Sequence, residues 1–257
     1  MLADLYRGAT EDQAARELLE PLASVEARAL KARPARDAVA ALSPRDGVHV
    51  IAEIKRKSPS KGSLADIPEP VVLGRAYEEG GASAISVLTE GRKFGGSLAD
   101  LAVVASAVGV PVLRKDFIAS EYQVIEARAN GADWILLIMA GLDDSQVRHL
   151  LGVARTWGMA ALVETHSRDE VLRAIDCGAE IIGVNARDLT TFELDTELFG
   201  RLVSLIPEGV IRVAESAVAN SQDVARYREQ GAHAVLIGEA LVTGNQPAER
   251  VREFVNA

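Results

Sequence analysis

Cysteine is almost absent from this chain of 257 residues, because Cys177 is the only one. A single cysteine excludes an internal disulfide framework and any metal site built from several cysteines. No two histidines have the spacing of four residues that places zinc ligands on one helical face; they are His49, His149, His166 and His233. We therefore expect neither a metal nor another cofactor.

Long apolar runs and an excess of positive charge are also missing. The longest strongly apolar stretch runs from Trp134 to Leu142, well short of the roughly 20 residues that cross a bilayer. The acidic, helix-like N-terminus has no signal-peptide pattern. The formal net charge of −9 argues against a general attraction to nucleic acid or anionic membrane, although a local basic patch could hold a small anion. These features predict a cytoplasmic protein that binds a small molecule, with no nucleic-acid or membrane partner.

The composition that is present is ordinary for a globular domain, with 48% hydrophobic and 25% charged residues. The length matches the roughly 250 residues of a (β/α)8 barrel. From Gly47 onward, short Val/Ile/Leu-rich runs alternate with longer amphipathic segments, a pattern typical of βαβ units. Eight such runs are predicted as strands: Val48–Lys55, Ala84–Thr89, Pro111–Lys115, Trp134–Met139, Ala161–Glu164, Ile181–Asn185, Ile211–Glu215 and Ala234–Ile237.

Eight strand–helix units favour a closed barrel over an open Rossmann sheet, because no G-x-G-x-x-G follows the first strand. Glycines that precede the strands are expected to end helices in left-handed caps; they are Gly80, Gly81, Gly109, Gly131, Gly158, Gly178 and Gly231. We predict an α/β protein with one domain over 1–257, a (β/α)8 TIM barrel over 47–257 preceded by an N-terminal helical extension over 1–46.

The N-terminal extension is predicted to form one to three helices, separated at Pro21 and Pro34. An apolar stripe is expected to run along one helical face; its members are Leu18, Leu22, Val25 and Ala29. We expect the extension to cover part of the barrel and to help close the substrate pocket.

Polar residues that end an apolar run are candidates for catalysis, because barrel enzymes place their chemistry at the C-terminal ends of the strands. In the first strand, Glu53 and Lys55 alternate with apolar residues and so share one face, which should point into the barrel mouth. A solvated loop would explain Arg56 and Lys57, but it explains poorly a glutamate inside an apolar run.

Four further strands end in polar side chains: Lys115 after the third, Glu164 after the fifth, Asn185 and Arg187 after the sixth, and Glu215 and Ser216 after the seventh. One such residue would be a weak signal, because surface ion pairs at strand ends are common and stabilise little. Their joint occurrence predicts an acid–base site on one rim of the barrel.

The segments that carry these residues resemble the successive motifs of the indole-3-glycerol-phosphate synthase family, and bacterial members in particular. They are IAEIKRKSPS (51–60), VLRKDF (112–117), ALVETH (161–166), GVNARDL (183–189) and AES (214–216). The resemblance covers nearly the whole chain, including the extension. It implies a carbon–carbon lyase of tryptophan biosynthesis, a carboxy-lyase. This enzyme converts a phosphorylated small molecule, 1-(2-carboxyphenylamino)-1-deoxyribulose 5-phosphate, into indole-3-glycerol phosphate, carbon dioxide and water.

The resemblance also implies roles for the catalytic residues. Lys115 is the position that the family assigns as the general acid of ring closure, and Lys55 lies beside it. Glu164 and Glu53 are the candidates for the base, and Asn185 belongs to the same set. The sequence leaves open which lysine acts in dehydration and which glutamate serves as the base.

Substrate contacts are implied for a further group of residues: Ser58, Phe94, Phe117, Arg187, Glu215 and Ser216. The two phenylalanines would line the anthranilate pocket, although phenylalanine is commonly buried for its area alone. His166 follows the fifth strand, but the family does not use it, and we expect an exposed polar side chain there.

Main-chain N–H groups after the seventh and eighth strands are expected to hold the phosphate; the matching residues are Ser216, Ala217, Gly238 and Glu239. Two of these depart from the family. Ala217 stands where glycine is common, and Glu239 stands where some members carry serine. A left-handed backbone at Ala217 would be strained, whereas a right-handed one would not, and the sequence leaves this open.

Two other functions remain as alternatives. One is another phosphate-binding barrel enzyme, such as phosphoribosylanthranilate isomerase or a Schiff-base aldolase, and the other is a non-catalytic phosphate-binding scaffold. The paired Glu53 and Lys55 argue against the isomerase, and the complete set of acid and base positions argues against the scaffold. A Schiff-base lysine would be detected by trapping with borohydride.

Overall fold

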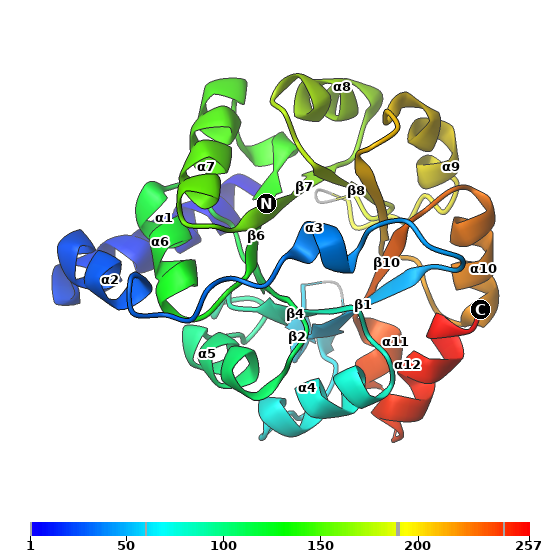
Figure 1. The fold of residues 1–257 in the computed structure, drawn as a ribbon, viewed down its shortest axis with the longest axis horizontal. Coiled ribbons are helices and arrows are strands. Elements are labelled where there is room, and N and C mark those ends of the chain that lie inside the picture. Colours follow the sequence, from blue (N-terminus) through cyan, green and yellow to red (C-terminus); the bar gives the residue numbers. More distant parts are fainter. Residues whose placement is uncertain (1, 60, 189–190, 244) are drawn as a thin grey trace.

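Eight parallel strands close into a barrel in the computed structural model of the chain, which describes residues 2–59, 61–188, 191–243 and 245–257 (Figure 1). Each strand lies beside the next one in sequence, and β1 closes the ring by pairing with both β4 and β10. The predicted barrel is therefore confirmed, and every predicted strand overlaps an observed one. The strands are β1 (His49–Ile54), β4 (Ala84–Leu88), β5 (Val112–Lys115), β6 (Trp134–Ile138), β7 (Ala160–Thr165), β8 (Ile181–Asn185), β9 (Ile211–Glu215) and β10 (Ala234–Ile237).

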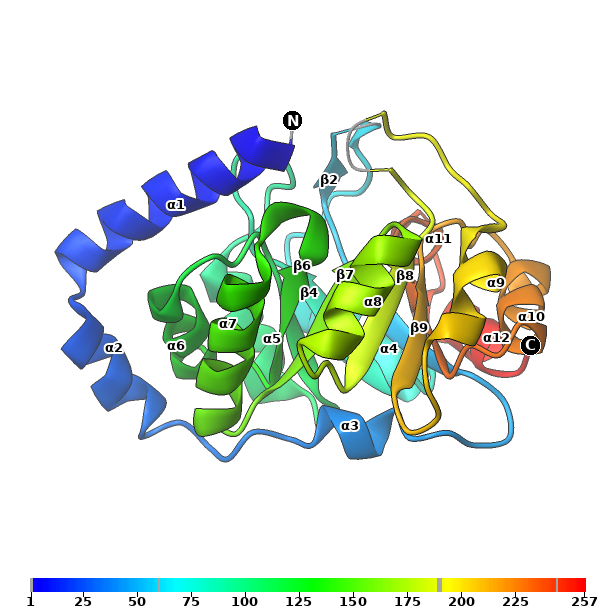
Figure 2. The same ribbon diagram turned by 90° about the horizontal axis from the view of Figure 1, so that it is seen from above.

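Helices cover the outside of the barrel (Figure 1), and no helix in the described ranges is long and apolar enough to cross a membrane. A small hairpin, β2 (Lys57–Ser58) with β3 (Gly62–Ser63), projects from the loop after β1 (Figure 2). Short 3-10 turns cover Met139–Gly141 and Val203–Leu205. The helices are α4 (Pro70–Glu79), α5 (Leu98–Ala107), α6 (Glu121–Ala129), α7 (Asp144–Thr156), α8 (Arg168–Asp176), α9 (Leu198–Leu202), α10 (Ser221–Glu229), α11 (Glu239–Val242) and α12 (Pro247–Val255).

The predicted glycine caps are confirmed at most positions and wrong at two. Positive φ angles occur at Gly81, Gly131, Gly158, Gly178 and Gly231. Gly80 is right-handed instead, because its neighbour Gly81 takes the left-handed position. Glycine is needed at 80 for space, since a Cβ there would lie 2.5 Å from the carbonyl oxygen of Ala248. Gly109 is not left-handed either, since α5 ends one residue earlier in extended Val108.

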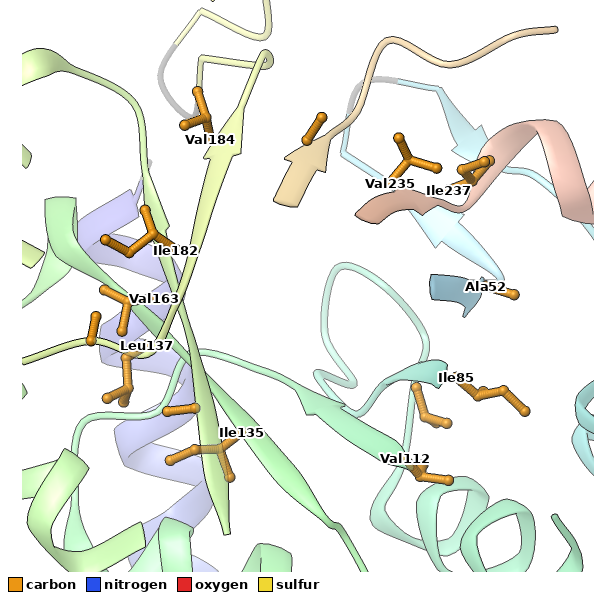
Figure 3. Packing of buried hydrophobic residues seen from close by; sticks show 14 of the residues in the cluster. Ala52, Ile85, Val112, Ile135, Leu137, Val163, Ile182, Val184, Val235 and Ile237 are labelled. Atoms are coloured by element: carbon orange, nitrogen blue, oxygen red, sulfur yellow. The ribbon is translucent and has the colours of Figure 1, made fainter. Parts of the chain in front are cut away.

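Alternate residues of each strand face opposite sides of the barrel wall, as the pleat of a β-strand requires. The outward set packs under the helices, as Figure 3 shows for Ala52, Ile85, Val112, Ile135 and Val163, among others. The inward set fills the barrel with apolar side chains that include Ile51, Leu113, Trp134, Leu162, Ile181 and Val213. Toward the C-terminal ends of the strands, the same alternation brings ionisable side chains inward, so that Ile51 is followed by Glu53 and then Lys55.

The N-terminal residues form three helices, α1 (Leu2–Leu19), α2 (Leu22–Ala29) and α3 (Ala38–Ala41). The breaks at Pro21 and Pro34 are confirmed. The predicted apolar stripe is wrong at Leu18, whose residue surface is 87% exposed, because the break at Pro21 puts it on a different helix from Val25. Val25 and Ala29 instead pack against α6.

The extension wraps around one side of the barrel. Figure 2 shows that α1 begins near the hairpin end of the barrel, while α3 lies at the opposite end. Ala38 and Leu42 belong to the apolar cluster that fills the barrel, so α3 closes its N-terminal end.

Asp133 anchors the link between α2 and α3. Its buried carboxylate accepts hydrogen bonds from Arg33 Nη1 at 2.6 Å and from Arg36 Nη1 at 3.1 Å. It also accepts the N–H of Val112 at 2.8 Å, which ties the extension to β5.

We predict that Asp133→Asn lowers the free energy of unfolding by about 2 to 3 kcal/mol, because two charge-assisted contacts lose their acceptor charge. Chemical denaturation measures this change. Asp176→Asn, at an exposed position on α8, is the matched control and should change stability by less than about 0.5 kcal/mol. Equal stabilities for the two variants would show that Asp133 does not anchor the extension.

Candidate active site

A cavity of about 640 Å3 opens at the C-terminal ends of the barrel strands. All of the predicted site residues except Ser58 line it: Glu53, Lys55, Phe94, Lys115, Phe117, Glu164, Asn185, Arg187, Glu215, Ser216, Ala217, Gly238 and Glu239. Ser58 lies in the hairpin, where its hydroxyl accepts the N–H of Lys61 at 3.2 Å. Ser60 and Leu189, which end two of the motifs, lie outside the described residues.

Glu53 and Lys55 form an ion pair at the end of β1, with Lys55 Nζ 2.7 Å from Glu53 Oε1. Burial raises the pKa of the Glu53 carboxyl, but the ammonium groups of Lys55 and Lys115 lower it more, so that the net pKa lies below its usual value. Gly238 leaves room for the pair, because a Cβ at this position would overlap Glu53 Oε1 and lie 3.0 Å from Lys55 Nζ. Glu53 is therefore ionised beside a lysine at neutral pH.

Lys115 ends β5 between two buried carboxyl groups. Its Nζ lies 3.5 Å from Glu164 Oε2 and 3.9 Å from Glu215 Oε2. Burial acts to lower the pKa of Lys115, but the neighbouring carboxylates, that of Glu164 above all, raise it above its usual value. Lys115 is thus protonated and carries a proton into the cavity.

The two carboxyl groups beside Lys115 differ in charge. Burial acts to raise the pKa of Glu164. The charge of Lys115 and the contacts with His166 and Asn185 lower this pKa more, so that it lies well below its usual value. Burial and the charge of Glu164 hold the pKa of Glu215 well above its usual value. Gly183 makes room for Glu215, because a Cβ there would overlap Glu215 Oε1. The site therefore pairs an ionised Glu164 with a neutral Glu215.

Glu215 is also the carboxyl group that is open to a ligand. Its protonated form donates a hydrogen bond to Glu164, but no donor in the described part of the chain reaches either of its oxygens. Buried acceptors are nearly always satisfied in native proteins, so these oxygens can accept from a molecule bound in the cavity.

His166 is not an exposed polar residue, so that prediction is wrong. Its side chain is only 12% exposed, with Nε2 3.3 Å from Glu164 Oε1 and Nδ1 3.3 Å from Glu170 Oε2. The signal that sequence reasoning missed is the Ser-x-x-Glu pattern from Ser167 to Glu170, which begins α8 and brings a carboxylate back to His166.

Asn185 is oriented by two donors at the end of β8. The Ser216 hydroxyl and the Arg187 N–H donate to Asn185 Oδ1 at 2.7 Å and 3.0 Å. Because both contacts use the amide oxygen, the amide N–H2 is directed to Glu164, whose pKa it helps to lower. Asn185 thus links the acid–base group to Ser216.

An aromatic wall bounds one side of the cavity. The ring centroids of Phe94 and Phe117 lie 6.1 Å apart, and Tyr6 of α1 meets Phe117 edge-on at 5.7 Å. Arg92, in the loop that carries Phe94, binds Asp12 of α1 at 2.6 Å. The extension therefore contacts Phe117 directly and the loop of Phe94 through Arg92, but none of its described residues lines the cavity.

The opposite side of the cavity is formed by the loops after β9 and β10. Ser216 and Ala217 are both left-handed, with φ angles of 69° and 54°, so the strained alternative applies at Ala217. Glu239 begins α11 and pairs with Lys61 from the hairpin loop. Lys61 and Arg250 also line the cavity, and the sequence did not indicate them because neither directly ends an apolar strand.

The fold and this cavity define a class of protein, a barrel enzyme whose acidic and basic side chains line one cavity at the C-terminal ends of the strands. No group of three or more His, Cys, Asp or Glu residues in the described ranges is placed to hold a metal ion.

Solved structures share the fold at about 15% sequence identity. A 3-hexulose-6-phosphate synthase from Salmonella typhimurium has a TM-score of 0.65, with 81% of this chain and 97% of that chain covered. A thiamine phosphate pyrophosphorylase from Pyrococcus furiosus has a TM-score of 0.61, with 80% and 93% covered.

Sequence comparison identifies the family. The model of the family described as indole-3-glycerol phosphate synthase matches residues 2–254. An indole-3-glycerol phosphate synthase of Leifsonia xyli is 58% identical, with 99% of this chain and 97% of that protein covered. One from Beutenbergia cavernae is 52% identical, with 100% and 95% covered. The chain belongs to the indole-3-glycerol phosphate synthase family.

We predict that Ala217→Gly raises the free energy of unfolding by about 0.5 to 1 kcal/mol. Glycine removes the left-handed strain of the folded state, about 1 to 2 kcal/mol. This gain exceeds the free-energy cost of the extra conformational entropy that glycine gives the unfolded chain. Thermal and chemical denaturation test this change. Ala219→Gly is the matched control in the same loop, where φ is not positive, and it should destabilise. A destabilised Ala217→Gly variant would contradict the strained turn.

Proposed function

We propose that this chain performs the reaction of its family, the conversion of 1-(2-carboxyphenylamino)-1-deoxyribulose 5-phosphate into indole-3-glycerol phosphate, carbon dioxide and water. The observation that carries the proposal is the presence of two ammonium–carboxylate pairs, Lys115 with Glu164 and Lys55 with Glu53, on one cavity. The reaction needs an acid twice, once to close the ring and once to expel water, and each pair supplies one.

Ring closure joins the anthranilate carbon that bears the carboxylate to the carbonyl carbon of the ribulose chain. The carbonyl oxygen gains a proton as the new carbon–carbon bond forms, and Lys115 is the donor. Its protonated state and its place between Glu164 and Glu215 support this role. Carbon dioxide then leaves, and the electrons of the broken bond restore the aromatic ring.

Dehydration removes the hydroxyl group that ring closure created. An acid protonates this hydroxyl as the carbon–oxygen bond breaks, and a base takes a proton from the neighbouring methylene carbon, which completes the indole double bond. We assign the acid to Lys55 and the base to Glu53. Their 2.7 Å contact supports the assignment, since the ionised partner accepts a proton while the ammonium donates one.

The two sides of the cavity suit the two ends of the substrate. The aromatic wall of Phe94 and Phe117 offers a flat apolar surface for the anthranilate ring. Main-chain N–H groups of Ser216, Ala217, Gly238 and Glu239 are proposed to hold the phosphate. The support is their place on the cavity in the loops after the seventh and eighth barrel strands, where many barrel enzymes bind phosphate. Arg187 also lines the cavity and is proposed to contact the substrate. The same is proposed for Ser58, whose hairpin reaches the cavity through Pro59 and Lys61.

Observations at the two lysines disfavour a Schiff-base aldolase. A lysine that attacks a carbonyl needs a neutral amine. Lys115 is instead held protonated by its carboxylate neighbours, and Lys55 is paired with Glu53. The Glu215 oxygens that no donor reaches, in a cavity that keeps every acid and base, disfavour a non-catalytic scaffold.

The direct test is a steady-state assay with the anthranilate–ribulose phosphate substrate, in which indole fluorescence reports the product. We expect turnover without an added cofactor. Purified, folded protein that forms no indole product would overturn the proposal, and substrate that is trapped on a lysine by borohydride would favour the aldolase.

We predict that Lys115→Met lowers kcat about a hundredfold or more, the usual contribution of a positioned acid, while the fold is retained. The control is Lys31→Met, which removes an exposed lysine of the extension and should leave kcat unchanged. Circular dichroism checks the fold of both variants. More than half of the wild-type kcat in folded Lys115→Met would contradict the assignment of the acid.

A further inference from the structure

His166 stands behind the acid–base group without lining the cavity. It follows β7 directly, two residues after Glu164, and its ring lies between Glu164 on one side and Glu170 on the other. It is not among the residues that line the cavity, so a substrate bound there meets Glu164 and not the imidazole. Any effect of His166 on the reaction must therefore pass through Glu164.

The start of α8 fixes the place of the ring. Glu170 Oε2 accepts the main-chain N–H of His166 at 2.7 Å and lies 3.3 Å from its Nδ1. The Glu170 main-chain N–H in turn donates to Ser167 Oγ at 3.3 Å, which is the N-cap contact of this helix. Because one carboxylate holds both the backbone and the ring, His166 has little freedom to turn away from Glu164.

The contacts divide the oxygens of Glu164 between two cations. Oε1 faces His166 Nε2 at 3.3 Å, and Oε2 faces Lys115 Nζ at 3.5 Å. Because the imidazole contacts Oε1, Oε2 is the oxygen directed toward Lys115. The contact with the imidazole thus sets the rotation of the Glu164 carboxylate plane.

We propose that His166 is a positioning residue, an imidazolium bridge between Glu164 and Glu170 that holds Glu164 ionised and directs its Oε2 toward Lys115. The inference rests on the proposed function, because it assigns Glu164 and Lys115 to the reaction.

The charges around the ring support a protonated bridge. The ionisable groups that face it are Glu164 from β7, Glu170 from α8 and, at longer range, Glu215 from β9. Burial acts to lower the pKa of His166, but the carboxylates of Glu164 and Glu170 raise it to about 10. Nδ1 makes a hydrogen-bond contact with Glu170 Oε2, and Nε2 faces Glu164 Oε1 at 3.3 Å as an ion-pair contact, so only the imidazolium form presents an N–H to both carboxylates.

Protonation also fits the charge balance of the buried layer. With Glu215 neutral, the carboxylates of Glu53 and Glu164 face Lys55, Lys115 and His166, and Glu170 supplies a compensating negative charge on the outer side of the ring. Loss of the imidazolium would leave Glu164 with Lys115 as its one cationic contact in the described part of the chain. The pKa of Glu164 would then rise, and its carboxylate would be able to rotate.

The test compares His166→Gln with His149→Gln, which replaces an exposed histidine of α7. In steady-state turnover of the anthranilate–ribulose phosphate, we expect His166→Gln to lower kcat about ten- to hundredfold, the usual consequence of a misplaced catalytic group, with KM changed less than about threefold. The control should keep both constants. A kcat within twofold of wild type would overturn the proposal, as would a rise in KM that accounts for the whole loss, because this would mean direct contact with the substrate.

A second variant keeps the imidazole and removes its outer partner. Glu170→Gln takes away one of the two carboxylates that raise the pKa of His166, so His166 loses its proton at a lower pH. We expect the basic limb of the kcat profile to move to lower pH, by about one unit, whereas KM stays within threefold. An unchanged basic limb in the folded variant would contradict the bridge, and this result is available even if His166→Gln does not fold.

Nuclear magnetic resonance separates this proposal from the proposed function, since it needs no turnover. In the wild-type chain labelled with 15N-histidine, both ring nitrogens of His166 should show the imidazolium signature at pH 7 and should titrate above pH 8. A neutral ring at pH 7 would overturn the bridge whether or not the protein makes indole-3-glycerol phosphate. An imidazolium in a protein without turnover would instead confirm the bridge and reject the reaction.

Discussion

Lys115 places one ammonium group between two buried carboxyl groups, 3.5 Å from Glu164 and 3.9 Å from Glu215, and the rest of the site depends on this contact. Two carboxylates so close together in a buried layer cannot both keep their charge at low cost. Lys115 compensates Glu164, and Glu215 remains protonated. One cation thus leaves a protonated Lys115, an ionised Glu164 and a neutral Glu215 on the cavity, beside the Lys55–Glu53 pair to which we assign dehydration.

The barrel and its extension hold this arrangement from outside. Arg114, the neighbour of Lys115 on β5, points outward and is fully buried, where it binds Asp116 and Glu126 at 3.0 Å each. Glu126 also binds Arg16 of α1 at 2.6 Å. A continuous chain of charges therefore runs from the N-terminal extension to Asp116, between Lys115 and Phe117. The same helix reaches the aromatic wall through Tyr6, so α1 supports both the acid and the surface proposed for the anthranilate ring.

Much of this structure could be predicted from the sequence because the relevant signals are local. The alternation of a strand is a property of neighbouring residues, so the sequence pattern alone assigns Glu53 and Lys55 to one inward face. The same holds for the eight strands and for the proline breaks in the extension. The polar residues that follow apolar runs at Lys115, Glu164 and Glu215 could be placed on one rim, because parallel strands end at the same side of a barrel.

The features that could not be predicted depend on partners distant in sequence or on backbone geometry. Lys61 and Arg250 reach the cavity from a loop and from an outer helix, and neither carries a periodic signal. The side chain of His166 is buried by its contact with Glu170 at the start of α8, and in the sequence Ser167 and Glu170 indicate only an N-cap of this helix. The left-handed angle of Ala217 is set by the closure of the loop around it, since alanine itself prefers the other conformation.

The protonation states around Lys115 are the central claim, and carboxyl 13C nuclear magnetic resonance of the glutamate-labelled chain tests them directly. Glu53→Gln, Glu164→Gln and Glu215→Gln would assign the signals of these three carboxyl groups. The account predicts that at pH 7 the Glu215 signal has the chemical shift of a protonated carboxyl, while those of Glu53 and Glu164 have the shift of carboxylates. Three ionised carboxylates at pH 7, or a protonated Glu164 beside an ionised Glu215, would contradict it.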